Sequence, residues 1–443
     1  MAEILYDDAL PLFAARIRDL LGERSLIDNL ILRDSEGRLT FVRLDPAANE
    51  TALAALRGEV AALAPYLDPQ PVATPADLFD DSLNDPALGV IEWIEHPAFS
   101  GFVRVVERRI AGQDWLRRPL PPQDGVPPVI VFASHKGGVG RSTALAVTTA
   151  HLAATGRNAL VIDLDLEAPG LGGMLLPADQ LPEFGLLDFY VESGLRAIDR
   201  AFLDRMIAPS PLTSGRGLVH VAPAVGRRSE SYPANLLGKL SRAYLEEVSP
   251  DPAVPPRGFL DRTRVLIKDL AAMGRYDAIL VDARAGLNET TAATLLGLGG
   301  WSLLFGIDTP QTFQGYRYLL AFLGRYRPAV GDTGEDWRGR LRLVHAKAAA
   351  NPDSWTHFYD QAYDLFAETL YDEAGGADDD AAFNFDRHDA AAPHKAWHIL
   401  ADTTYAEFDP LSRPEVLGSE VFRRTFADLL DGIDRLLETA RDV

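Results

Sequence analysis

The sequence predicts an α/β fold in which a doubly wound, mostly parallel sheet follows a small α+β domain. First, short apolar runs alternate with helical stretches from residue 129 onward, which is typical of buried parallel strands joined by helices. Second, a glycine-rich turn stands between the first apolar run and an alanine-rich stretch. Third, a proline-rich segment separates these runs from a different pattern before it. The apolar runs lie at 129–133, 158–163, 218–222, 278–282, 301–307 and 341–344.

The first part of the chain has the pattern of a small α+β domain. Its apolar spacing predicts a helix at 8–21 that stops at Gly22, hairpin strands at 26–32 and 39–44, a helix at 50–63 and a strand at 102–106. We therefore expect an N-terminal accessory domain over 1–118, a stiff proline-rich linker over 119–128 and an α/β domain over 129–443.

Composition and charge exclude several classes of protein. The chain of 443 residues has no cysteine, which excludes disulfides, thiolate zinc sites and cysteine-bound iron–sulfur clusters. The formal net charge of −21 repels phosphate backbones and anionic lipids, so we expect neither a nucleic-acid nor a membrane partner. No apolar run reaches membrane-spanning length, and the first residues carry no signal-peptide pattern. We expect a cytoplasmic protein.

Residues 134–143 read Ser-His-Lys-Gly-Gly-Val-Gly-Arg-Ser-Thr and predict a phosphate-binding loop. The glycines let the backbone curl so that successive N–H groups point inward, and the following helix adds the positive end of its dipole. Ser142 places a hydroxyl where Mg²⁺ would lie between the outer phosphates. The alternative is a glycine-rich turn without a ligand. The agreement of glycines, cations, hydroxyl and strand–helix context favours the phosphate loop.

The run Lys-Gly-Gly-Val-Gly-Arg-Ser-Thr resembles the deviant Walker A motif of the ParA/MinD family of P-loop ATPases, of the SIMIBI class. The resemblance implies a P-loop NTPase domain that binds ATP with Mg²⁺ and forms an ATP-dependent homodimer. It makes Lys136 the signature lysine, which reaches across the dimer to the partner's phosphates. Two positions depart from a strict Walker A, with His135 in place of Gly and Arg141 in place of Lys. Arg141 keeps the charge but is a wide planar fork, which bears on hydrolysis.

Carboxylates at two predicted strand ends complete the site. Asp163 and Asp165 lie two residues apart, so both can face the loop from the end of one strand. The resemblance places them at switch I, where Asp165 orients the attacking water and Asp163 lies near Mg²⁺. It also makes Asp282 the Walker B ligand of Mg²⁺, and Gly286 the switch II residue whose N–H senses the γ-phosphate. The alternative for either switch I carboxylate is a turn or helix cap. Arg284 would either contact phosphate or pair with a neighbouring carboxylate, and we expect the carboxylate pair.

The expected site therefore has three parts. Its catalytic residues are Lys136, Asp165 and Arg141, its metal ligands are Ser142, Asp163 and Asp282, and its nucleotide-binding residues are Lys136, Gly137, Gly138, Val139, Gly140, Arg141, Ser142, Thr143 and Gly286. ATP is favoured over GTP because the Asn-Lys-x-Asp signature is absent and Ala346 stands where the family often has Asn. The segment from Tyr405 to Pro414 is expected to wall the adenine.

Three hypotheses for the function remain open. The first is a slowly hydrolysing ATP switch, a nucleotide-sandwich homodimer that recruits a protein partner. The Arg-for-Lys loop resembles a sub-group of bacterial ATPases found in multi-gene systems, some thought to act in defence against phage. The second is a nucleotide-binding scaffold with little or no hydrolysis. The third is a DNA- or membrane-positioning ATPase, which the acidic charge disfavours. The amphipathic stretch from Val421 lacks the basic bias of a membrane helix, so we expect it to pack on the sheet.

Overall fold

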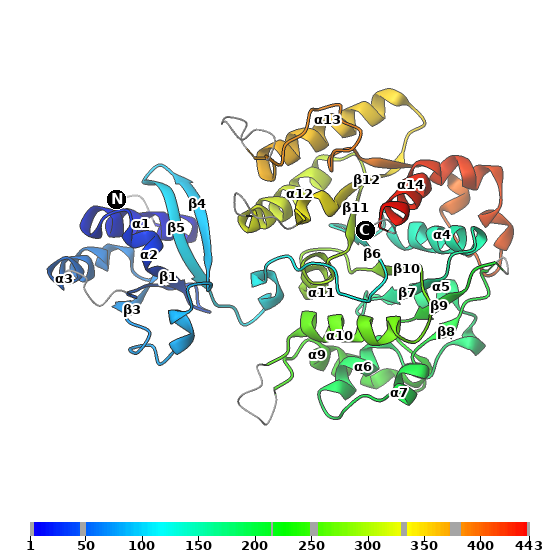
Figure 1. Cartoon of the computed structure of the whole chain (residues 1–443), viewed down its shortest axis with the longest axis horizontal. Helices are drawn as coiled ribbons and strands as arrows, with labels where there is room; N and C mark the ends of the chain where they lie inside the picture. The colour runs from blue at the N-terminus through cyan, green and yellow to red at the C-terminus, as the bar shows by residue number, and fades with distance from the viewer. Residues whose placement is uncertain are drawn as a thin grey trace. The chain divides into compact units, whose positions relative to one another are not determined.

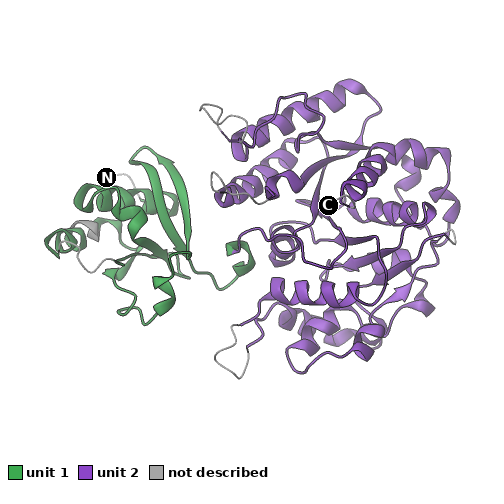
Figure 2. Ribbon diagram, viewed as in Figure 1, with its two compact units in different colours: residues 1–116 green, residues 117–443 purple. Residues whose placement is uncertain are grey.

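The computed structural model (Figure 1) describes residues 4–44, 50–213, 216–248, 256–328, 335–372 and 382–440. The chain forms two compact units, Met1–Leu116 and Arg117–Val443 (Figure 2). This division falls close to the end at residue 118 that the sequence suggests for the accessory domain, and it assigns the proline-rich segment to unit 2.

Unit 1 is built on a five-stranded sheet in the order β3-β2-β1-β5-β4. Helical residues Phe13, Ile17 and Leu56 share a buried core with Phe41 and Val103 of the sheet. The strands are β1 (Leu30–Arg33), β2 (Leu39–Val42), β3 (Leu67–Ala73), β4 (Val90–His96) and β5 (Phe99–Glu107), and the helices are α1 (Tyr6–Leu21), α2 (Ser25–Asp28) and α3 (Glu50–Glu59).

The strand expected at 26–32 is wrong in its first half, because Ser25–Asp28 form helix α2. Asn29 explains the change. Its side-chain amide donates to the Ser25 carbonyl at 3.1 Å, and its Oδ1 accepts from the Leu44 N–H at 2.8 Å. Such side chain–backbone bonds compete with a regular ladder. The expected hairpin still forms, since the shortened β1 pairs with β2 in antiparallel fashion.

Unit 2 contains an eight-stranded sheet in the order β13-β12-β11-β6-β10-β7-β9-β8. Neighbouring strands are parallel, except that β8 is antiparallel to β9. The prediction of an α/β fold with a large, mostly parallel sheet is therefore confirmed. The strands are β6 (Val129–Ser134), β7 (Ala159–Asp163), β8 (Ala208–Pro209), β9 (Val219–Ala222), β10 (Ala278–Asp282), β11 (Trp301–Gly306), β12 (Leu341–Ala348) and β13 (Trp397–Leu400).

Helices cover both faces of this sheet. Helices α4, α5 and α14 share one core with the strands, and Figure 1 shows α10, α11 and α12 on the other side. The C-terminal amphipathic stretch packs on the sheet as expected, with Phe426, Leu429 and Ile433 buried in the core that holds Trp397. No helix of the described residues is both long and apolar enough to span a bilayer. The helices are α4 (Arg141–Ala154), α5 (Leu171–Leu175), α6 (Leu186–Ser193), α7 (Arg200–Asp204), α8 (Arg227–Ser231), α9 (Leu236–Ala243), α10 (Phe259–Ala271), α11 (Glu289–Ala292), α12 (Pro310–Leu323), α13 (Pro352–Thr369) and α14 (Glu420–Thr439).

Residues 117–128, which include the proline-rich segment 119–128, pack along unit 2. The Arg117 guanidinium donates to both carboxylate oxygens of Asp261 in α10, at 3.1 and 3.2 Å. The Leu120 N–H donates to the Leu296 carbonyl at 2.7 Å. A stiff polyproline-type segment can pack in this way without needing its own ladder of hydrogen bonds.

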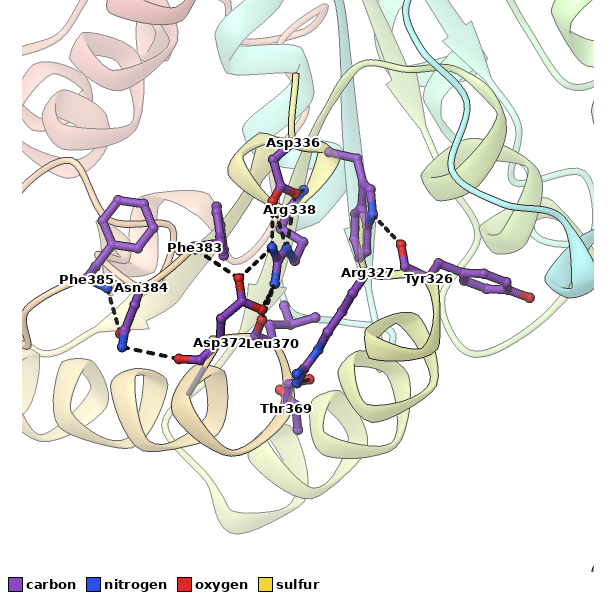
Figure 3. A network of polar contacts seen from close by, with 11 residues as sticks. Tyr326, Arg327, Asp336, Arg338, Thr369, Leu370, Asp372, Phe383, Asn384 and Phe385 are labelled. Atoms are coloured by element: carbon purple, nitrogen blue, oxygen red, sulfur yellow. Dashed lines mark hydrogen bonds and ion pairs between the residues drawn. The ribbon is translucent and has the colours of Figure 1, made fainter. Parts of the chain in front are cut away.

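A polar network ties the start of β12 to the end of α13 (Figure 3). Buried Arg338 pairs with Asp336 and with Asp372, each at 2.7 Å. Its guanidinium also donates to the Leu370 carbonyl at 2.8 Å and lies 4.3 Å from the centre of the Phe383 ring. One arginine therefore joins the segment before β12 to the end of α13 and to Phe383.

Candidate functional site

The glycine-rich sequence forms the turn between β6 and α4, since β6 ends at Ser134 and α4 begins at Arg141. Gly138 and Gly140 have φ of +75° and +92°, a region that favours glycine. A Cβ added at Gly137, Gly138 or Gly140 would meet no atom within 4 Å, so the turn borders open space. Helix α4 has 14 residues, and the turn therefore lies at the positive end of a full helix dipole.

A cavity of about 740 Å³ opens at this turn. Its polar end is the loop itself, from Gly137 to Thr143, with Asp165 and Lys347 beside it. The rest of its lining includes the end of β13, the segment that follows it, and α14. The volume falls in the range of small-molecule and cofactor sites, about 300–1,000 Å³.

Part of the cavity lining is aromatic. Tyr405 and Phe426 line it and meet edge to face, with ring centroids 4.9 Å apart. The wall expected over Tyr405–Pro414 is only partly in place, because Asp409 and Ser412 line a second cavity of about 390 Å³ beside Asp163. The contribution of α14 was not expected, since an amphipathic pattern shows which face is buried but not what that face borders.

Arg141 is buried, and its guanidinium fork joins three side chains. Its Nε donates to the Asp282 carboxylate, its Nη2 donates to Asp165 Oδ2 at 2.9 Å, and its Nη1 donates to Ser134 Oγ at 3.3 Å. Burial alone lowers the pKa of Arg141, but the charges of Asp282 and Asp165 and their hydrogen bonds raise it on balance. The side chain expected to bind phosphate thus neutralises two carboxylates of the same site in this structure.

The structure brings together the three aspartates singled out in the sequence. Strands β7 and β10 are adjacent, and their register places Asp163 opposite Asp282. Ser142 Oγ donates to Asp282 Oδ2 at 2.7 Å, so the loop hydroxyl and the carboxylate at the end of β10 are in contact. Asp163 also caps the turn after its strand, because its Oδ1 accepts from the Asp165 N–H at 3.2 Å.

Burial makes Asp163 and Asp282 weaker acids than an ordinary aspartate. Asp163 is 1% exposed, and burial, followed by the nearby charge of Asp282, raises the pKa of Asp163 to about 8. Burial also raises the pKa of Asp282, although Arg141 and Ser142 oppose the shift. Asp163 Oδ2 and Asp165 Oδ1 are buried without a hydrogen-bond partner among the described residues. Buried oxygen atoms in this condition favour a nearby cation or donor.

These residues fit Mg²⁺. The Ser142 hydroxyl and the carboxylates of Asp163 and Asp282 are hard oxygen donors, and Asp163 Oδ2 lacks a partner among the described residues. The described part of the chain contains no cluster of three or more His, Cys, Asp or Glu side chains able to hold a metal. Mg²⁺ commonly uses one or two protein carboxylates and takes its other ligands from phosphates and water.

Four of the expected site residues do not line the cavity: Lys136, Asp163, Asp282 and Gly286. Asp163 lines the second cavity instead. Lys136 is exposed and makes no hydrogen bond or ion pair with any described residue. Gly286 has φ of +95°, and its N–H donates to the Ser134 carbonyl at 2.9 Å, so in this structure that donor is committed to β6. The prediction for Arg284 is confirmed, because its guanidinium pairs with the Glu167 carboxylate.

Lys347 is a site residue that sequence reasoning missed. It lies near the end of β12 with φ of +55°, a left-handed conformation that disfavours a non-glycine residue by roughly 1–2 kcal/mol. The pairing of β12 with β13 shifts register between His345 and Ala348, on either side of it. The Lys347 Nζ donates to the Gly138 carbonyl at 2.7 Å, and the side chain lines the cavity. A bulge and a left-handed lysine leave no signal in an apolar strand pattern.

The chain matches no protein-family model and no curated protein. Among solved structures it is similar to a ParA family ATPase from Chlorobium tepidum TLS, at 17% identity and a TM-score of 0.42 over 68% of this chain and 98% of that one. It is similar to the septum site-determining protein MinD of Pyrococcus horikoshii OT3, complexed with Mg-ADP, at 18% identity and a TM-score of 0.42 over 71% and 98%. It is also similar to the cell division ATPase MinD of Pyrococcus furiosus, at 19% identity and a TM-score of 0.41 over 70% of this chain and 99% of that one. These likenesses are weak, and the function proposed below rests on the residues of this chain.

Proposed function

We propose that this chain binds ATP in the cavity and acts as a slowly hydrolysing molecular switch. The observation that carries the proposal is the cavity itself, which is lined both by a glycine-rich turn at a helix N-terminus and by the aromatic pair Tyr405 and Phe426. Helix N-termini bind phosphate through N–H groups and dipole, and aromatic rings suit a purine base. Adenine is preferred because the sequence lacks the Asn-Lys-x-Asp signature of guanine recognition.

The carboxylates have separate tasks in this proposal. Ser142, Asp163 and Asp282 would hold Mg²⁺, which neutralises charge on the outer phosphates when bound. Asp165 has one buried oxygen, Oδ1, with no partner among the described residues. That oxygen can accept a hydrogen bond from a water beside the loop and orient it for attack.

Slow turnover follows from the contacts of Arg141. Its guanidinium already binds Asp165 Oδ2 and the Asp282 carboxylate, so part of the charge that would orient water is neutralised. A carboxylate paired with a guanidinium is a weaker base than a free one. The same contacts favour the second candidate function, a nucleotide-binding scaffold with little or no hydrolysis.

Lys136 supports the proposal of a homodimer. Its ammonium is exposed and has no ion pair with the described residues, so it is available to phosphates outside its own cavity. Burying a triphosphate between two subunits needs cations from both sides. We therefore propose that ATP joins two copies of the chain and that the dimer recruits a protein partner.

Binding, turnover and mass can be measured on the whole chain with ATP and Mg²⁺. We expect calorimetry to detect ATP binding, phosphate release to be slow, and light scattering to show a dimer only with ATP. Lys136→Ala should keep ATP binding and lose the ATP-dependent dimer, whereas Lys268→Ala, an exposed lysine of α10, should behave as wild type.

Each part of the proposal has its own contrary result. No uptake of ATP or GTP by the wild-type chain would refute nucleotide binding altogether. Binding with no phosphate release would select the scaffold instead of the switch. An unchanged dimer in the Lys136→Ala variant would remove this lysine from the interface between subunits.

A further inference from the structure

The charge balance of the cavity draws attention to Lys347. Among the described residues, the charged side chains that line the cavity are Arg141, Asp165, Lys347 and Asp402. Arg141 is paired with Asp165 at 2.9 Å, and Asp402 is paired with Arg424 at 3.2 Å. Lys347 has no carboxylate partner in the described part of the chain. Its positive charge is therefore the uncompensated one at this surface.

The backbone directs this lysine toward the loop. The left-handed φ of +55° and the register shift on either side of Lys347 depart from regular strand geometry, and bulges of this kind re-aim a side chain next to a site. The result is the 2.7 Å hydrogen bond from Nζ to the Gly138 carbonyl, which spans from the end of β12 to the glycine turn. Non-glycine residues held in sparsely populated conformations cluster at ligand clamps and active sites.

We propose that Lys347 binds the phosphates of the nucleotide and supplies the cation that Arg141, held by Asp165 and Asp282, does not provide. An ammonium has three donors, so Lys347 can keep its bond to the Gly138 carbonyl and also donate to a phosphate oxygen. This inference rests on the proposed function, because it requires phosphates at the glycine turn.

A purely structural role would make a different prediction. If Lys347 only supported the turn through Gly138, its removal would weaken ATP binding by a factor that does not depend on salt. If its charge acts on phosphates, the loss must grow with the number of phosphates, because the Coulomb interaction grows with the charge of the ligand. The three nucleotides are therefore compared at low and at high salt, since only a loss that acts through charge shrinks when salt screens it. A loss for ATP that is the same at both salt concentrations would assign Lys347 a structural role and overturn the inference.

The test is calorimetry of AMP, ADP and ATP with the full-length chain and four variants. Lys347→Met removes the charge and keeps the length, Lys347→Arg keeps the charge, and Lys268→Met is the control on an exposed lysine of α10. Lys347→Gly removes the side chain and relieves the left-handed strain, so this variant should unfold at a higher temperature than wild type without nucleotide.

We expect Lys347→Met to bind ATP about ten-fold more weakly, which is the effect of one charge-assisted hydrogen bond, with a smaller loss for ADP and the smallest for AMP. Lys347→Arg and Lys268→Met should stay close to wild type, and Lys347→Gly should combine higher stability with weaker ATP binding. The inference is overturned if Lys347→Met binds ATP within about two-fold of wild type, or if all three nucleotides lose the same factor. A wild-type chain that binds none of the three would refute the proposed function, and the inference with it.

Discussion

Replacing Arg141 by methionine tests whether its guanidinium holds the carboxylates of the site together. Methionine keeps an unbranched apolar chain and removes the charge, so the packing of the first turn of α4 is largely retained. The Arg141 side chain is 8% exposed, and those of Asp282 and Asp165 are 2% and 13% exposed. The substitution therefore removes the countercharge of two carboxylates that water hardly reaches.

The magnitude follows from this burial. Removing one partner of a buried ion pair costs about 3–5 kcal/mol, because the other charge stays buried without compensation. We expect Arg141→Met to lower the free energy of unfolding of unit 2 by this amount. Arg141→Lys should cost about 1.5–3 kcal/mol, since one ammonium cannot reproduce the fork that serves Asp282 and Asp165 together.

Urea unfolding followed by circular dichroism measures these free energies, and hydrogen exchange of the β6–α4 peptides shows where the structure loosens. Arg200→Met is the matched control. Its pair with Asp204 is exposed, with side-chain exposures of 60% and 56%, and should contribute under about 0.5 kcal/mol. If Arg141→Met unfolds within about 1 kcal/mol of wild type, Arg141 does not neutralise buried charge and the reasoning fails.

Two further predictions concern other parts of unit 2. Burial acts to raise the pKa of Asp372, but hydrogen bonds from Arg338 and from the Phe383 N–H lower it on balance below its ordinary value of 3.8. A carboxyl group with a lowered pKa stabilises the fold above its ordinary pKa, and this stabilisation is lost as the pH falls. Asp372→Asn should therefore lower the free energy of unfolding by about 1 kcal/mol at pH 7 and by progressively less below about pH 4, as measured in urea titrations. A difference independent of pH would contradict this prediction. Tyr405 lines the cavity. If its ring contacts the base, which AMP, ADP and ATP share, Tyr405→Ala should weaken all three by one common factor, about five-fold in calorimetry. A loss that grows with phosphate number would place Tyr405 elsewhere.

The parts of the site that could be predicted depend on local patterns. The glycine turn and the strand-end aspartates Asp163 and Asp282 follow from apolar runs, glycines and polar residues that are adjacent in the chain. The pair between Arg141 and Asp282 joins residues 141 positions apart, and no local pattern indicates which carboxylate a buried arginine will meet.

Lys347 shows the same limit within a single strand. Its apolar neighbours predict a regular β12, but the register shift after His345 comes from the pairing with β13, a strand absent from the sequence-based prediction. Backbone conformation at a sheet edge is set by the partner strand and by the turn it faces. For that reason the direction of this lysine could not be obtained from the sequence of its own strand.

The contacts of Asp282 determine what a bound nucleotide has to change. One carboxylate oxygen accepts from Arg141 and the other accepts from Ser142 at 2.7 Å, so a cation that takes Asp282 or the Ser142 hydroxyl as a ligand competes with these contacts. The Ser142 hydrogen bond contributes about 0.5–1.5 kcal/mol, whereas breaking the Arg141 pair costs about 3–5 kcal/mol. Binding should therefore release the Ser142 hydroxyl and keep the Arg141 pair. One oxygen of Asp165 then stays paired with the same guanidinium. The strength of the Arg141 pair and the slow turnover therefore have one origin. Arg141→Lys should raise the rate of phosphate release while it lowers the free energy of unfolding.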